Sequence, residues 1–158
     1  MIGYGRFMRH RTLLPLVLAA VLGFTACAPT GEVDTAVLSE QADDYIAGIG
    51  SGGGHLGSGT FSLGPQNTDG GSVTLGEIDA EVSAIRAICF GEGKASVGFE
   101  LRTEDSTTIA NTFDVPCDSA QHDATLGDVV SFVTDAKLHA TWLSGTEQSV
   151  VVSVVTPE

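Results

Sequence analysis

Aromatic and basic residues are scarce in this sequence, and their scarcity excludes whole classes of protein. Aromatic residues make up 6% of the 158 positions, and seven Lys and Arg stand against twenty Asp and Glu, for a net charge of −13. A nucleic-acid binder needs a surplus of basic side chains for phosphate contacts, so this class is excluded. With 42% hydrophobic residues the chain is too apolar for wholesale disorder, and its length predicts a single domain.

The N-terminal segment lacks a hydrophobic run long enough for a permanent transmembrane helix. Its uncharged stretch, Leu13–Ala26, has 14 residues, whereas a helix that spans a bilayer needs about 20. Three arginines, Arg6, Arg9 and Arg11, precede the stretch. Because a basic segment followed by a short apolar one is typical of an export signal, the sequence predicts a signal peptide over residues 1–26.

The residues that end this stretch, Phe24-Thr25-Ala26-Cys27, resemble the lipobox of bacterial lipoproteins. The resemblance implies that Cys27 carries a diacylglyceryl thioether and a fatty acid such as palmitate, and is the first residue of the mature chain. It further implies a partner, the cell membrane, reached through this lipid anchor at the extracytoplasmic face. The alternative is ordinary signal cleavage at the small-residue pair Ala26-x-Ala28, which releases a soluble secreted protein.

The small number of cysteines bears on this choice. Cys89 and Cys117 are the two that follow Cys27, and an even pair in an exported chain predicts a disulfide between them. Cys27 is then the odd thiol, and lipidation accounts for it. The cysteine count therefore favours the lipid anchor over free secretion.

Apolar residues recur at helical spacing beyond the predicted anchor, namely Leu38, Ala42, Tyr45, Ile46 and Ile49. They predict a helix of about three turns, capped by Asp34 or Ser39 and ended by Gly48 and Gly50. A single stripe of this kind favours packing against the chain itself over docking to a partner. Residues 27–58 are thus expected to hold the lipidated cysteine, this helix and a glycine-rich tether.

The remaining residues, 59–158, have the pattern of an all-β domain, because short runs rich in Val, Ile, Thr and Phe alternate with turn-forming clusters. Two packed antiparallel sheets in a jelly-roll-like β-sandwich are expected, with a helix considered only near Leu126–Ala136. The run Val150–Val155 is apolar on both sides and is expected to be covered. About eight strands are predicted: 59–64, 72–76, 81–90, 95–103, 107–117, 122–127, 136–143 and 148–156.

No catalytic residue, cofactor site or metal site is predicted. The histidines His55, His122 and His139 lack the spacing of a metal site. Gly52, Gly54 and Gly57 match the spacing G-x-G-x-x-G, but a dinucleotide site needs that loop between a strand and a long helix, and here a predicted helix precedes it.

Two acidic pairs and one aromatic residue are the nearest approach to a binding site. Glu104-Asp105 at one turn, and Asp118 with Asp123 around another, are candidates for calcium, although neither has the spacing of a calcium-binding loop. A solvated acidic surface is the favoured interpretation. Trp142 is the best aromatic candidate for stacking on a ligand, but its phase with Leu138 favours core packing.

The sequence therefore predicts a lipid-anchored, non-enzymatic β-domain at the cell surface, acting as a binding or structural module for an envelope protein or glycan. The alternatives are an envelope hydrolase with scattered Asp, Glu and His, or a secreted soluble domain. A concave pocket with converging acids, or a His–carboxylate pair, would favour the hydrolase.

Overall fold

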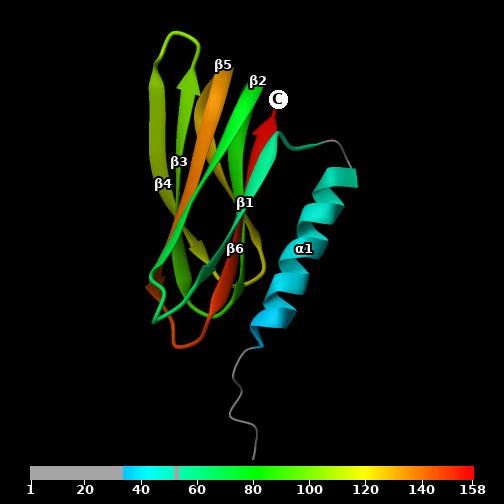
Figure 1. The fold of residues 1–158 in the computed structure, drawn as a ribbon, viewed down its shortest axis with the longest axis vertical. Helices are drawn as coiled ribbons and strands as arrows, with labels where there is room; N and C mark the ends of the chain where they lie inside the picture. The colour runs from blue at the N-terminus through cyan, green and yellow to red at the C-terminus, as the bar shows by residue number, and fades with distance from the viewer. Residues whose placement is uncertain (1–33, 52–53) are drawn as a thin grey trace, which may run out of the picture. The chain divides into compact units, whose positions relative to one another are not determined.

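The computed structural model describes residues 34–51 and 54–158, so the predictions on the export signal and Cys27 lie outside the described residues. Helix α1 is followed by six antiparallel strands that form one sheet in the order β1-β6-β2-β5-β3-β4 (Figure 1). The predicted all-β class with one N-terminal helix is confirmed. The bounds are α1 Thr35–Ser51, β1 Gly57–Leu63, β2 Asp69–Gly91, β3 Lys94–Thr103, β4 Thr108–Pro116, β5 Gln121–Ser144 and β6 Ser149–Pro157.

The strand count differs from the sequence-based expectation. The described chain has six strands in one hydrogen-bonded sheet, and not about eight strands in two separate sheets of a jelly roll. The predicted strands 72–76 and 81–90 are one strand, β2, and the predicted strands 122–127 and 136–143 are one strand, β5. Leu126–Ala136 lies within β5, so the helix considered there is absent.

Bulges explain why the two long strands look interrupted in the sequence. The pairing of β2 with β5 shifts register three times along this part of β2: between Gly76 and Ala80, between Ala80 and Val82, and between Val82 and Ala84. Left-handed backbone conformations occur at Glu77 (φ 56°) and Asp79 (φ 42°) in β2, and at Gly127 (φ 84°) in β5. Bulges bend a strand without ending its ladder, so both strands bend at these positions and continue.

The bends let the two halves of the sheet face each other across the main core. The later half of β2 pairs with β6, whereas the later half of β5 pairs with β3. The apolar side chains of β3 face inward and are at most 1% exposed, namely Ala95, Val97, Phe99 and Leu101. Every strand contributes to this core, with Phe61, Ile85, Phe99, Val115, Leu138 and Val151 as examples.

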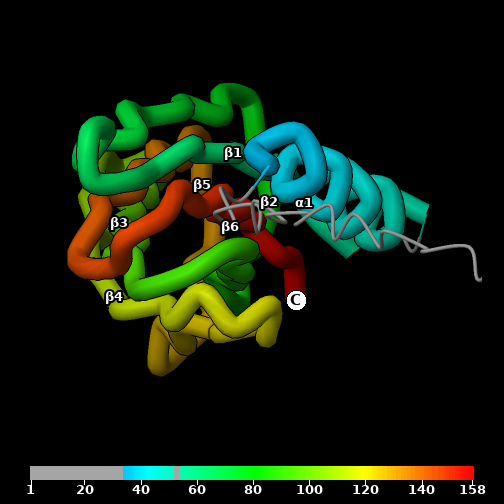
Figure 2. The backbone as a smooth tube through the Cα atoms, turned by 90° about the horizontal axis from the view of Figure 1, so that it is seen from below, coloured from blue at the N-terminus to red at the C-terminus, as the bar shows by residue number. Residues whose placement is uncertain are grey.

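Helix α1 covers the other face of β6 and the later half of β2. Val150, Val152 and Val154 of β6 form a second apolar cluster with Leu38 and Ala42 of the helix, and α1 lies on one side of the strands (Figure 2). This explains why the last apolar run of the sequence has no polar face. The prediction that the helix packs against its own chain is confirmed.

The ends of the helix differ slightly from expectation. The Asp34 carboxylate accepts the Ala36 N–H at 2.9 Å, which confirms Asp34 as the N-cap. At the other end the helix continues through Gly48 and Gly50 to Ser51. The predicted tether is also shorter than expected, because β1 begins at Gly57.

The predicted disulfide between Cys89 and Cys117 is confirmed. It joins β2 to the segment between β4 and β5. Two backbone bonds support the same crossing: the Cys117 N–H donates to the Gly93 carbonyl at 2.9 Å, and the Ser119 N–H donates to the Cys89 carbonyl at 3.0 Å.

The strands and α1 run between two opposite ends of the domain (Figure 1). The proximal end holds the start of α1 and the connections 64–68 and 145–148, which together line one cavity. The distal end holds the bend of β2 at residues 76–82, the bend of β5 at 127–132 and the β3–β4 turn at 104–107. These distal segments are in contact, since Ala80 pairs with Val133 and the Glu104 N–H donates to the Phe132 carbonyl at 3.1 Å.

Candidate functional site

A cavity of about 510 Å³ lies at the distal end and is named here the distal pocket. Its volume falls within the range of small-molecule binding sites. The β3–β4 turn forms one wall and the bend of β5 forms the other. The lining residues are Thr103, Glu104, Asp105, Thr107, Ser131 and Phe132.

Phe132 is the most exposed large hydrophobic side chain of the described residues, at 65%. A bulge places it there. Ala80 pairs with Val133 and Val82 pairs with Val130, so a step of two positions in β2 lies opposite a step of three positions in β5. Val130 and Val133 are both buried, so the extra length directs the Phe132 side chain away from the core.

The backbone of Phe132 is left-handed, with φ at 59°. For a bulky residue with a Cβ this conformation costs on the order of 1 kcal/mol. Gly, or the tolerant Asn, would occupy the same backbone with less strain. Neither burial nor backbone preference explains a phenylalanine here, which marks the position as a candidate for ligand contact.

The β3–β4 turn presents two carboxylates beside this ring. The Thr103 hydroxyl and the Thr107 N–H both donate to Asp105 Oδ1, and these bonds, the first above all, hold the pKa of Asp105 below its ordinary value. On the opposite wall the Ser131 hydroxyl donates to Glu81 Oε1 at 3.1 Å. The predicted acidic pair Glu104-Asp105 therefore lies at a pocket, together with an aromatic ring that the sequence did not indicate.

Charge is unevenly distributed over the domain. The three distal segments contain no Lys or Arg and carry six exposed acidic residues: Glu77, Asp79, Glu81, Glu104, Asp105 and Asp128. By contrast, each basic residue of the described chain has an acid opposite it. The four pairs are Lys94–Asp114 (Nζ to Oδ2, 3.0 Å), Arg86–Asp123 (Nε to Oδ2, 3.7 Å), and Arg102–Asp135 and Lys137–Glu100, which are opposite in the strand register.

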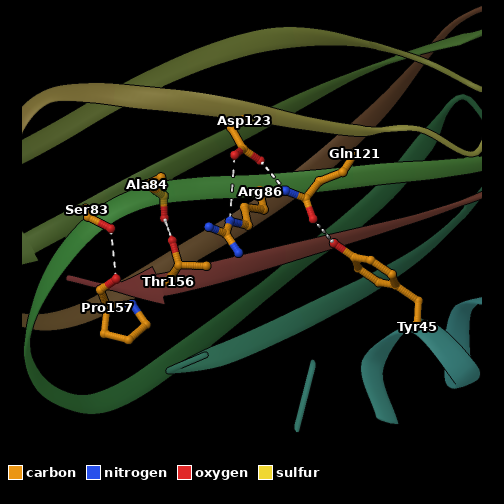
Figure 3. A network of polar contacts seen from close by, with 8 residues as sticks. All are labelled: Tyr45, Ser83, Ala84, Arg86, Gln121, Asp123, Thr156 and Pro157. Carbon is orange, nitrogen blue, oxygen red and sulfur yellow. Dashed lines mark hydrogen bonds and ion pairs between the residues drawn. The ribbon is translucent and has the colours of Figure 1, made fainter. Parts of the chain in front are cut away.

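A polar network connects α1 to the sheet (Figure 3). The Tyr45 hydroxyl donates to Gln121 Oε1 at 3.1 Å, and the Gln121 side-chain amide donates to Asp123 Oδ1 at 3.0 Å. Burial raises the pKa of the Tyr45 hydroxyl, and its ring packs edge-on against Phe90 with 6.4 Å between centroids. Tyr45 therefore fixes the helix on the sheet, and the network is structural.

The second predicted acidic pair does not form a cation site. Asp123 faces Arg86, whereas Asp118 lies 3.4 Å from His122 Nε2 and accepts the Ala120 N–H at 2.9 Å. The Ala120 bond, with a smaller effect of His122, holds the pKa of Asp118 below its ordinary value. Within residues 34–51 and 54–158, three or more His, Cys, Asp or Glu side chains are nowhere grouped as for a metal ion.

The other candidate residues of the sequence are dispersed. Trp142 is partly buried and packs against the main core, as favoured from its phase. His139 lies over Gly98 of β3, where an added Cβ would collide with the imidazole ring. His55 lies between α1 and β1, and of the glycine motif only Gly54 and Gly57 are described.

The cavity at the proximal end has a volume of about 750 Å³. Asp34 lines it together with Glu147 and Gln148, and the Asp34 carboxylate already occupies the N-terminus of α1. In the part of the chain that the structure describes, no helix has the length and apolar character needed to cross a membrane.

Comparison of the sequence with models of protein families finds no match. Comparison with curated proteins finds none of significant similarity.

Proposed function

We propose that this chain is a lipid-anchored, non-enzymatic binding module of the bacterial cell envelope, which presents the distal pocket away from the membrane. The observation that carries the proposal is the position of that pocket, with its exposed Phe132, at the end of the domain opposite the start of α1. The export signal and the lipobox-like Cys27 supply the anchor.

Chain length supports this orientation. Asp34 lies seven positions after Cys27 in the sequence, and a chain of that length reaches at most about 25 Å. A lipid on Cys27 therefore keeps the start of α1 close to the membrane. Helix α1 has 17 residues, or about 25 Å of axial length, and the distal pocket lies beyond its other end.

The surface charge fits a protein held off an anionic membrane. Beyond the signal segment, twenty acidic residues stand against four basic ones, a fivefold excess. Like charges repel over about 10 Å at moderate salt. The domain would thus stand clear of anionic lipids and polymers, with its distal end free to meet a ligand.

The test of the anchor is the fate of a Cys27→Ala variant in the native bacterium. We expect the wild type and a Thr30→Ala control in the membrane fraction, with a diacylglyceryl thioether on Cys27 by mass spectrometry. Cys27→Ala should lose the lipid. An unmodified Cys27 in a soluble wild-type product would instead establish the secreted domain and overturn the proposed anchor.

Two observations favour the alternative of an envelope hydrolase: the carboxylates of Glu104 and Asp105 at the distal pocket, and the His122–Asp118 pair at 3.4 Å. Asp105 already accepts hydrogen bonds from Thr103 and Thr107. Neither His122 nor Asp118 lines the distal pocket or the cavity at the proximal end. A general base acts within hydrogen-bond reach of a bound substrate, which makes an exposed pair outside a cavity a weak candidate. Hydrolysis of envelope polymers that disappears in His122→Ala would establish the enzyme.

A further inference from the structure

The distal pocket carries an inference about the chemistry of its ligand, and this inference depends on the binding module proposed above. Its features are the exposed Phe132 ring, the adjacent carboxylates of Glu104 and Asp105, and the hydroxyl groups of Thr107 and Ser131. These groups select for a ligand with a flat or apolar part and a part that is attracted to carboxylates.

Electrostatics decides the sign of the ligand's charge. Six exposed acidic residues and no basic residue lie in the three segments of the distal end, and the basic residues elsewhere already face acids. The nearest basic residue in sequence is Arg102, which precedes Thr103 and lies opposite Asp135 in the strand register. The six acids therefore leave an excess of negative charge at the distal end. An anionic ligand is repelled, and a cationic one is drawn toward the pocket.

Geometry decides which cation fits. A guanidinium or ammonium group over an aromatic face is attracted by the ring quadrupole, and arginine can stack on a ring while its N–H groups donate to a neighbouring carboxylate. Phe132 and Glu104 line the same pocket from opposite walls, so one arginine side chain could use both. Val129, also exposed at 39%, lies on the same bend and offers apolar surface to flanking residues.

We infer that the distal pocket binds an arginine or lysine side chain within a basic segment of a partner protein. The strained, exposed Phe132 then has a function that offsets its cost to stability, a trade-off common at binding sites. The excess of acidic residues also has a role, since it steers a basic partner to the distal end.

The test measures binding of short peptides to the full mature chain, isolated in a polyoxyethylene detergent. The probes are an eight-residue peptide of alternating arginine and glycine, its lysine and citrulline analogues, and the neutral sugar chitotetraose. Citrulline keeps the shape of arginine but has no charge. We expect the arginine and lysine peptides to bind, more weakly as salt rises from 20 to 200 mM, and the citrulline peptide and the sugar not to bind.

Variants locate the site. Phe132→Asn tolerates the left-handed backbone and should weaken arginine-peptide binding by about two- to fivefold, and Glu104→Gln should weaken it and reduce its salt dependence. The matched controls are at the proximal end: Leu143→Asn removes an apolar side chain that is 49% exposed, and Glu147→Gln removes one acid. Both should bind as the wild type, and circular dichroism checks that each variant is folded.

Three results would overturn the inference. Equal losses in Phe132→Asn and Leu143→Asn would mean that the acidic surface attracts peptides without a site. Equal binding of the citrulline peptide would exclude recognition of charge. Salt-independent binding of chitotetraose that requires Phe132, without arginine-peptide binding, would replace the basic partner by a glycan. In that last case the lipid-anchored binding module would still stand.

Discussion

Replacing Cys89 and Cys117 together by alanine should lower the free energy of unfolding by several kcal/mol. The disulfide spans a sequence separation of 28 residues, and the chain-entropy relation gives about 3.6 kcal/mol at 25 °C for a loop of that length. This is a large share of the roughly 5–15 kcal/mol that holds a typical domain folded. Because Cys89 is fully buried in the main core, loss of its sulfur adds a small packing cost.

The structure indicates that the variant should still fold. In the variant, the segment between β4 and β5 keeps two backbone hydrogen bonds, from Cys117 N–H to the Gly93 carbonyl and from Ser119 N–H to the Cys89 carbonyl. The disulfide acts mainly by restricting the unfolded chain. The variant should thus keep the native far-ultraviolet circular dichroism and lose stability.

The assay is urea unfolding followed by the fluorescence of Trp142, the only tryptophan, and by circular dichroism. The melting temperature should fall by about 10–20 °C for a domain of this size. Wild type under reducing conditions is the matched control and should lose a similar amount. If both the reduced wild type and the alanine variant unfold within about 1 kcal/mol of the oxidised protein, the loop-entropy argument is wrong.

Two further predictions concern single groups. Ser153 is buried at 0% exposure in β6, and its hydroxyl has no hydrogen-bond partner among the described residues. Ser153→Ala should therefore raise the free energy of unfolding, measured in urea, by about 1 kcal/mol. A lower free energy of unfolding in the variant would show that the hydroxyl does have a hydrogen-bond partner. The pKa of Asp105 is held low by its bond from Thr103, so its contribution to stability is complete above its ordinary pKa of 3.8 and is lost only as the pH falls through the lower folded value. The difference in stability between Asp105→Asn and wild type should accordingly be largest at pH 6 and shrink as the pH falls below 3.8. A difference that does not change with pH would contradict this assignment.

Most of the strands could be predicted from local pattern. Side chains alternate across a strand with a period of two residues, so the inward Val97 and Phe99 could be separated from the outward Ser96 and Glu100. The same rule identified Val150–Val155 as a strand covered on both faces, and α1 is what covers it. The helix followed from its stripe and from Asp34.

The breaks in β2 and β5 could not be predicted in the same way. Turn-forming residues usually mark the end of a strand, but Gly127 and Asp128 lie within a bulge of β5. Whether a strand ends or bends at such a residue depends on whether its partner continues the hydrogen bonds, and the partner is about fifty residues away. For this reason β2 and β5, which are continuous in the structure, were each predicted as two separate strands.

Half of the candidate site could be predicted. The acids Glu104 and Asp105 were identified at a turn, since charge and turn composition are local properties of the sequence. Phe132 was missed because it falls between the predicted strands 122–127 and 136–143, in the segment where a helix was considered. In the structure it lies in a bulge of β5 that exposes the ring.

The sequence alone determined the features that depend on neighbours along the chain: the strand faces, the helix stripe, the pairing of the only two cysteines after Cys27, and the acidic surface. Tertiary structure decided the features that depend on distant partners: the single bent sheet, the cover of α1 over β6, and the meeting of Phe132 with Glu104 at one pocket. The physical reason is that alternation and charge are read from adjacent residues, whereas a bulge is defined only against the strand with which it pairs.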